Sequence, residues 1–82
     1  MSVEAILLGI AAVAREHLAY DGPLALEARL IEDLRLDSIR LLTLAVEVEN
    51  HFQICLDPED DATIETVGDL VAAVGRKLHG ER

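Results

Sequence analysis

Aliphatic side chains recur at helical spacing in three stretches of this chain, and such a chain buries its apolar surface by packing helices together. The first stretch covers residues 3–19. The second follows Asp37 and ends near His51, and the third runs over residues 67–79. A short additional helix is expected after Pro58, because proline suits the first position of a helix. The sequence therefore predicts an all-α fold, a small four-helix bundle with three main helices and one short helix.

The middle stretch carries more apolar residues than one buried face requires. One stripe along it consists of Leu41, Leu44, Ala45, Val48 and Phe52. An adjacent stripe consists of Ile39, Leu42 and Val46. Because an ordinary surface helix has a single apolar stripe, this helix is either central in the bundle or keeps an exposed apolar strip for a partner.

Turn residues mark the segment that follows the first helix. Residues 20–23 include a glycine and a proline, which stop that helix. Residues 24–36 keep no helical period for long, so we expect a long, partly helical connection there. Leu30, Ile31 and Leu34 are expected to hold this connection to the core.

Length, composition and charge narrow the class of function. With 82 residues the chain has room for one domain, residues 1–82, and its hydrophobic content of 51% is too high for a disordered acidic tail. The formal net charge of −9 excludes a nucleic-acid binder, which needs a basic surface, and disfavours anionic membranes. The same charge favours partners with basic docking surfaces.

The single cysteine, Cys55, excludes an intrachain disulfide and a CxxC metal site, so no metal is expected. Since Cys55 lies between Ile54 and Leu56, we expect a small buried thiol rather than a nucleophile. A lone cysteine also fits a reducing compartment.

The apolar run at residues 5–14 is too short to cross a bilayer. Glu4 precedes this run where a secretion signal needs a basic residue. We therefore expect a cytoplasmic protein without membrane insertion, and we expect a monomer.

Ser38 opens the middle helix directly after Asp37, which is a favourable N-terminal cap. Its hydroxyl is expected beside the free N–H groups and the positive dipole end of that helix, where a phosphate ester is stabilised. A serine at a helix start is common, so this position alone identifies no function.

Around Ser38 the sequence resembles the acyl and peptidyl carrier proteins. The resemblance begins with residues 32–39 (EDLRLDSI), which look like the attachment motif of that family. It continues through the helix, an acidic turn at residues 57–60 and residues 64–70 (IETVGDL). In all, it covers about residues 3–78.

The resemblance implies that Ser38 carries a covalent 4′-phosphopantetheine arm, with Asp37 as the helix cap beside the site. The thiol of the arm would hold an acyl or aminoacyl group as a thioester, and the protein itself would catalyse nothing. The implied partners are a phosphopantetheinyl transferase and the enzymes that load and condense the carried groups.

Other residues near Ser38 are candidates for contact with these partners or with the arm. The resemblance favours Ile39 and Val46 as partner-facing, with the core as the other possibility. Arg40 is the only Lys or Arg in residues 38–75, and it is a candidate for a docking residue that selects among partners. Glu47 and Glu49 are expected first as a solvated face and second as docking contacts. Ile64 is expected either to pack in the core or to line the arm or its cargo.

Three positions depart from the pattern of fatty-acid carriers. Arg35 stands where the motif usually has glycine, and Arg40 and Thr43 stand where such carriers usually have acids. These departures favour a dedicated polyketide, nonribosomal peptide or modified-lipid pathway over housekeeping fatty-acid synthesis.

Two other classes of function compete with a carrier. An enzyme with Ser38 as nucleophile would need a base, and His51 would lie about 20 Å away along a continuous helix. Spacing does not exclude His17 or His79, but no G-x-S-x-G elbow surrounds Ser38. The alternative to a carrier is an unmodified helical adaptor that binds a partner through the middle helix.

Overall fold

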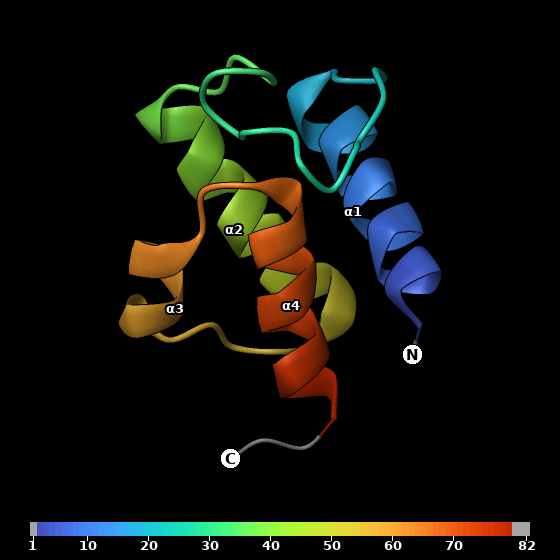
Figure 1. Ribbon diagram of the computed structural model, residues 1–82, viewed down its shortest axis with the longest axis vertical. Coiled ribbons are helices and arrows are strands. Elements are labelled where there is room, and N and C mark those ends of the chain that lie inside the picture. The colour runs from blue at the N-terminus through green and yellow to red at the C-terminus, as the bar shows by residue number, and fades with distance from the viewer. Residues whose placement is uncertain (1, 80–82) are drawn as a thin grey trace.

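The computed structural model describes residues 2–79, with the side chains of all of these except residues 60 and 61. Its helices are α1 (Val3–Leu18), α2 (Ser38–Phe52), α3 (Pro58–Thr63) and α4 (Val67–Leu78) (Figure 1). This arrangement confirms the predicted all-α fold with three main helices and one short helix. Within residues 2–79, no helix is both long and apolar enough to cross a membrane.

Side-chain caps fix where α1 and α2 begin. The Ser2 hydroxyl accepts a hydrogen bond from the amide of Ala5, and the Asp37 carboxylate accepts one from the amide of Arg40. Both helices start at the residue after the cap, as the sequence predicts. The α2 helix then runs one residue beyond His51, to Phe52.

The start of α4 is fixed by a reciprocal cap between Thr66 and Asp69. The Thr66 hydroxyl accepts the amide of Asp69, and Asp69 Oδ2 accepts the amides of Glu65 and Thr66 at 3.0 and 3.1 Å. These two backbone donors lower the pKa of the Asp69 carboxyl, because they stabilise its ionised form.

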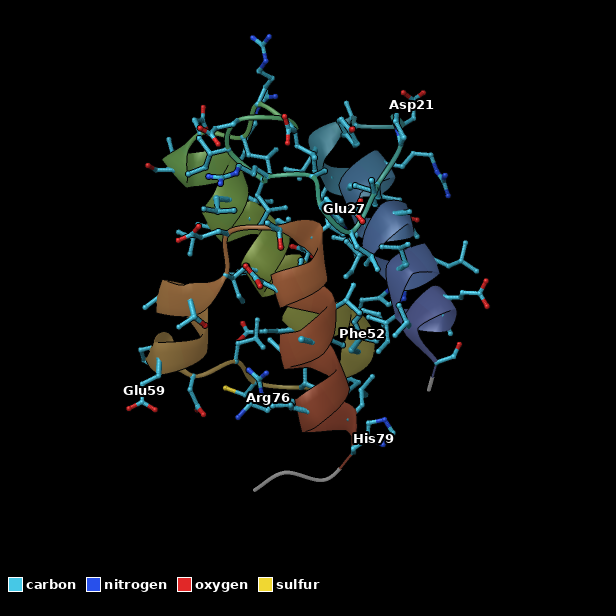
Figure 2. The ribbon with its side chains drawn as sticks, viewed as in Figure 1. Asp21, Glu27, Phe52, Glu59, Arg76 and His79 are labelled. Carbon is cyan, nitrogen blue, oxygen red and sulfur yellow. The ribbon has the colours of Figure 1, made fainter. Side chains whose placement is uncertain are left out.

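One core is shared by α1, α2, α4 and the α1–α2 connection. Its buried members are Ile6, Ile10, Val13, Leu30, Leu34, Leu36, Leu44, Val48, Phe52, Leu56, Val67, Leu70, Val71, Ala73 and Val74. Figure 2 shows Phe52 directed into the interior between α1 and α4, whereas Asp21 and Glu59 extend from the periphery. Aliphatic side chains thus supply nearly the whole core.

The contact between α1 and α2 depends on Gly9. A Cβ atom at Gly9 would overlap Cζ of Phe52 and lie 3.1 Å from Nε2 of His51. Since Phe52 is buried, its ring has little room to move away. The absence of a side chain at Gly9 therefore lets the two helices lie against each other.

Residues 19–37 connect α1 to α2 through turns, so the partly helical connection expected from the sequence is wrong. The backbone of this segment bonds to the start of α4 instead. Leu30 N donates to Glu65 O at 3.0 Å, and Gly68 N donates to Leu26 O at 2.8 Å. Backbone groups paired in this way are not available for the hydrogen bonds of a helix.

Two burial predictions in irregular segments are also wrong. Leu30 and Leu34 are buried as expected, but the side chain of Ile31 is 59% exposed. Cys55 is exposed although Leu56 beside it is buried. In turns and loops, neighbouring side chains point in different directions, so an apolar neighbour does not predict burial.

Candidate functional site

Ser38 is the first residue of α2, and it is exposed. Asp37 has an extended backbone and caps the helix with its side-chain carboxylate and its backbone carbonyl. Its carboxylate accepts the amide of Arg40, and its carbonyl accepts the amide of Leu41, each at 2.8 Å. The amides of Ser38 and Ile39 belong to the first turn, where N–H groups have no acceptor within the helix. The Ser38 hydroxyl therefore lies beside open donors at the positive end of the helix dipole.

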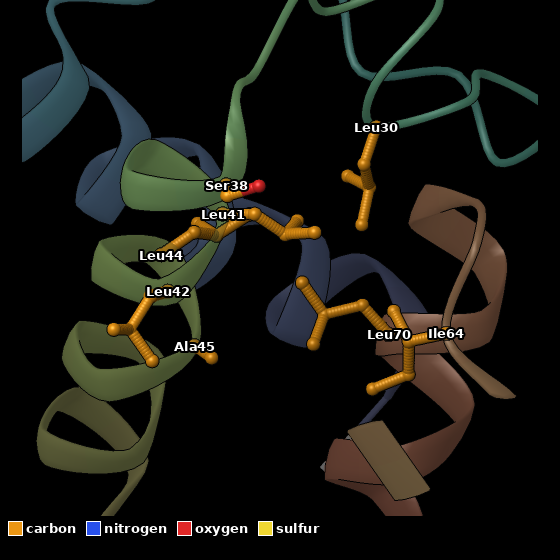
Figure 3. Close-up of a pocket in the computed structure, with 8 residues that line it drawn as sticks. All are labelled: Leu30, Ser38, Leu41, Leu42, Leu44, Ala45, Ile64 and Leu70. Carbon is orange, nitrogen blue, oxygen red and sulfur yellow. The ribbon is translucent and has the colours of Figure 1, made fainter. Parts of the chain in front are cut away.

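An apolar pocket of about 260 Å³ opens beside Ser38 (Figure 3). The first two turns of α2 form one wall, and side chains from the connection, α4 and the segment before α4 face it. The lining residues are Leu30, Ser38, Leu41, Leu42, Leu44, Ala45, Ile64 and Leu70. Ser38 is the one polar residue among them, so the pocket is an apolar cavity next to the Ser38 hydroxyl.

Among the residues that meet at this pocket, only Ser38 and Ile64 are expected from the sequence to lie near the arm. Ile64 is half-buried, packs against the core and lines the pocket, and its contact with the arm or cargo stays a prediction. Nothing in the sequence indicates that Leu30 and Leu70 line a pocket, because both follow the ordinary pattern of core residues. Their convergence depends on the hydrogen bonds that hold the connection against the start of α4.

Two arginines flank Ser38. Arg35 has φ 63°, in the left-handed region that favours glycine, which is the residue usual at this place in the carrier motif. Arg40 is exposed in the first turn of α2. In the part of the chain that the structure describes, neither guanidinium forms an ion pair. Two arginines without an ion pair thus lie near Ser38 in a chain that is acidic as a whole.

The second apolar stripe of α2 is exposed. The exposed fractions of Ile39, Leu42 and Val46 are 77%, 65% and 42%, while the first stripe contributes Leu44 and Val48 to the core. Of the two possibilities for this helix, a central position or an exposed apolar strip, the structure shows an exposed strip. We call Ile39, Leu42 and Val46 the α2 apolar strip. The docking function of Ile39 and Val46 stays a prediction.

Both acidic residues of α2 are engaged within the protein. Glu47 Oε1 lies 3.4 Å from Nε2 of His17 on α1. Glu49 Oε2 accepts the amide of Leu56 at 2.7 Å and so holds the loop that follows α2. These two carboxylates have structural partners, and their docking function stays a prediction.

The geometry offers Ser38 no catalytic partner on α2. His51 is separated from Ser38 by an unbroken helix, as the sequence argument assumed. His17 pairs with Glu47, between α1 and α2. Among the described residues, no group of three or more His, Cys, Asp or Glu side chains is placed to hold a metal ion.

Comparison with known proteins assigns the family. Residues 8–74 match the family model described as a phosphopantetheine attachment site. The chain is 36% identical over 78 residues to an acyl carrier protein of Thermotoga maritima, covering 94% of this chain and 96% of the relative. It is also 33% identical over 79 residues to a meromycolate extension acyl carrier protein of Mycobacterium tuberculosis, covering 95% of this chain and 68% of the relative.

The chain belongs to the acyl carrier protein family. A solved structure of a candidate acyl carrier protein from Mycobacterium tuberculosis has the same fold, with a TM-score of 0.79, 31% identity and coverage of 85% of this chain and 95% of that one. Acyl carrier proteins are non-catalytic and bear phosphopantetheine. An exposed hydroxyl with open amides beside it and an apolar pocket next to it fits such a group.

Proposed function

We propose that Ser38 carries the 4′-phosphopantetheine arm of this acyl carrier protein. The observation that carries the proposal is the exposed Ser38 hydroxyl at the start of α2, beside open amides and at the edge of an apolar pocket. A phosphodiester at this oxygen would lie at the positive end of the helix, where negative charge is stabilised. Asp37 supports the site as the cap that fixes the helix start.

Attachment needs no catalytic group from this chain. Ser38 Oγ forms a bond to the phosphorus next to the pantetheine of coenzyme A, and the bond from that phosphorus to adenosine 3′,5′-bisphosphate breaks. The hydroxyl proton passes to a base of the phosphopantetheinyl transferase. The thiol of the bound arm then holds an acyl or aminoacyl group as a thioester.

The pocket beside Ser38 is the proposed place for the apolar part of the cargo. Its walls are aliphatic, and Ile64 and Leu70 face the first turns of α2 across it (Figure 3). Burying an acyl chain there removes apolar surface from water, which is favourable.

The α2 apolar strip, together with Arg40, is the proposed docking surface for partner enzymes. These partners are a phosphopantetheinyl transferase and the enzymes that load and condense the carried groups. The strip begins beside Ser38, so a partner seated on it would have the base of the arm at its edge. Glu47 and Glu49 would contribute less, since both carboxylates already have partners in the fold.

A dedicated polyketide, nonribosomal peptide or modified-lipid pathway is the proposed context. Arg40 and Thr43 support this proposal, because neither residue supplies the acid that is usual at its position in fatty-acid carriers. The Thr43 hydroxyl instead donates a hydrogen bond to Ile39 O within α2. Similarity to a carrier named for meromycolate extension also supports a specialised lipid pathway. We propose that the protein acts as a cytoplasmic monomer with a single carrier domain.

The test is the intact mass of the apo protein after incubation with coenzyme A and a broad-specificity phosphopantetheinyl transferase. The wild type is expected to gain one phosphopantetheinyl group and Ser38→Ala none. The chain offers a matched control, because its other serine, Ser2, also lies at a helix start, and Ser2→Ala should be labelled like the wild type. Labelling of Ser38→Ala would refute the site. No labelling of the folded wild type would favour the unmodified adaptor.

A further inference from the structure

The walls of the pocket beside Ser38 consist of aliphatic side chains, apart from Ser38 itself. Seven of its eight lining residues are Leu, Ile or Ala. Among the side chains that the structure describes, no buried nitrogen or oxygen atom lacks a hydrogen-bond partner, so no unpaired polar group is directed at a ligand. The pocket of about 260 Å³ therefore presents hydrocarbon surface to the group that enters it.

Backbone amides at these walls are also engaged. The amide of Leu30 donates to Glu65 O at 3.0 Å. The amides of Leu41 and Leu70 each donate to the carbonyl four residues earlier, at 2.8 and 3.2 Å. The lining residues that follow Leu41 on α2 lie inside the helix, where each amide donates within the helix. A cargo carbonyl beside these residues would have to compete for amides that already have acceptors.

Attachment of the arm removes the one hydroxyl donor from the pocket. Once Ser38 Oγ is esterified, it has no proton to donate. The open amides of Ser38 and Ile39 lie at the start of α2, where the phosphate of the arm would be. In the loaded protein, the side chains that line the pocket therefore supply no hydrogen-bond donor.

The cost of desolvation separates the possible cargo groups. A carbonyl or hydroxyl that enters an apolar pocket loses its hydrogen bonds to water, and a charged amino group loses still more. Water cannot readily follow the polar group, because a buried water molecule needs two to four polar partners. A hydrocarbon chain has no such loss and gains from leaving water.

We infer that the carried group is a fully reduced hydrocarbon acyl chain, and that aminoacyl groups and oxygenated polyketide chains are excluded from the pocket. This inference rests on the proposed function, and it names the chemical class of the cargo. Of the three proposed kinds of pathway, a modified-lipid pathway supplies such a group. The enzyme that loads this carrier would then transfer a preformed fatty acyl group to the thiol of the arm.

The test compares cargo groups that differ in a single polar group. A broad-specificity phosphopantetheinyl transferase loads the protein from the coenzyme A thioesters of acetyl, octanoyl, 5-oxooctanoyl, 4-methylpentanoyl and leucyl groups. The octanoyl and 5-oxooctanoyl groups have the same number of carbon atoms and differ by one carbonyl. The leucyl and 4-methylpentanoyl groups differ by one amino group. The measurement is the Tm of each loaded protein.

The octanoyl group is expected to raise the Tm by about 4–8 °C above that of the acetyl form, and the 5-oxooctanoyl group by less than half as much. The shorter 4-methylpentanoyl group should raise the Tm by a smaller amount than octanoyl. The leucyl group should leave the Tm within about 1 °C of the acetyl form, because its amino group stays in water.

A matched pair of variants shows whether these differences arise in the pocket. Ala45 lines the pocket about two turns along α2 from Ser38 (Figure 3), so Ala45→Leu fills the space and should bring all five forms to about the same Tm. Ala72→Leu adds the same side chain at an exposed position on α4 and should keep the differences of the wild type.

Equal Tm values within either matched pair of cargo groups would overturn this inference and leave attachment at Ser38 intact. An octanoyl form no more stable than the acetyl form would also overturn it, together with the pocket as the place of the cargo. Failure of the folded wild type to gain any of these groups would overturn the proposed function itself.

Discussion

Arg35 occupies a backbone conformation that residues with a Cβ atom adopt at a cost. Its φ of 63° lies in the left-handed region, where that cost is about 1–2 kcal/mol relative to the right-handed conformation. The sequence shows only that arginine replaces the glycine usual in the motif. The structure explains why glycine suits this place, because the chain must turn here to bring Asp37 and Ser38 to the start of α2.

We predict that Arg35→Gly stabilises the protein. Glycine removes the left-handed strain but makes the unfolded chain more flexible, so the net gain should be about 0.5–1 kcal/mol. Urea unfolding of the apo protein measures this difference. Arg35→Ala is the control, because it loses the same charge and keeps the Cβ atom. A glycine variant no more stable than the alanine variant would contradict the strain at this position.

At the scale of the helices, the spacing of apolar residues made α1, α2 and α4 predictable, and Asp37 marked the start of α2. Ser2, Asp37 and Thr66 each accept a backbone N–H at the start of a helix, and a cap of this kind is recognisable from local sequence. The connection between α1 and α2 was not predictable in the same way. Its backbone bonds to residues beside α4, which are distant in sequence.

Two helical glycines should respond in opposite ways to the same substitution. Gly9→Ala should destabilise the protein by about 1–3 kcal/mol, because the added Cβ overlaps Phe52 between α1 and α2. Gly75→Ala in α4 should stabilise it by up to about 1 kcal/mol, because alanine favours a helix and the nearest atom, Cδ1 of Ile6, is 3.7 Å away.

Thermal or urea unfolding of both variants tests this pair of predictions. If both substitutions stabilised the protein, helix propensity would dominate the free energy of unfolding. That result would contradict the claim that α1 and α2 leave no room for a Cβ atom at residue 9.

At the scale of the whole molecule, the pocket is the feature that no single segment contains. It forms where the connection, the first turns of α2 and the start of α4 meet. We predict that an octanoyl group on the arm raises the Tm above that of the acetylated protein. Burial of several methylene groups at about 0.8 kcal/mol each stabilises the fold, by an expected total of about 1–3 kcal/mol.

The pocket can be filled without removing a core residue. Ala45→Leu should abolish the difference in Tm between the octanoyl and acetyl forms, because the larger side chain occupies the space for the acyl chain. Ala72→Leu adds the same volume at an exposed position on α4 and should leave the difference unchanged. An octanoyl effect that survives Ala45→Leu would place the acyl chain elsewhere.

The helical class could be predicted from the sequence alone, and so could the starts of the main helices, the family resemblance and the candidate Ser38. These features depend on periodicity, caps and motif spacing, all of which are local along the chain. The packing of the folded chain was needed to show which stripe of α2 is buried, that Ile31 and Cys55 are exposed, and that a pocket opens beside Ser38. The fold also shows that the carboxylates of Glu47 and Glu49 have partners, while the guanidinium of Arg40 has none in the described residues. Burial and charge pairing depend on contacts between segments far apart in sequence, and a one-dimensional pattern does not specify which segments meet.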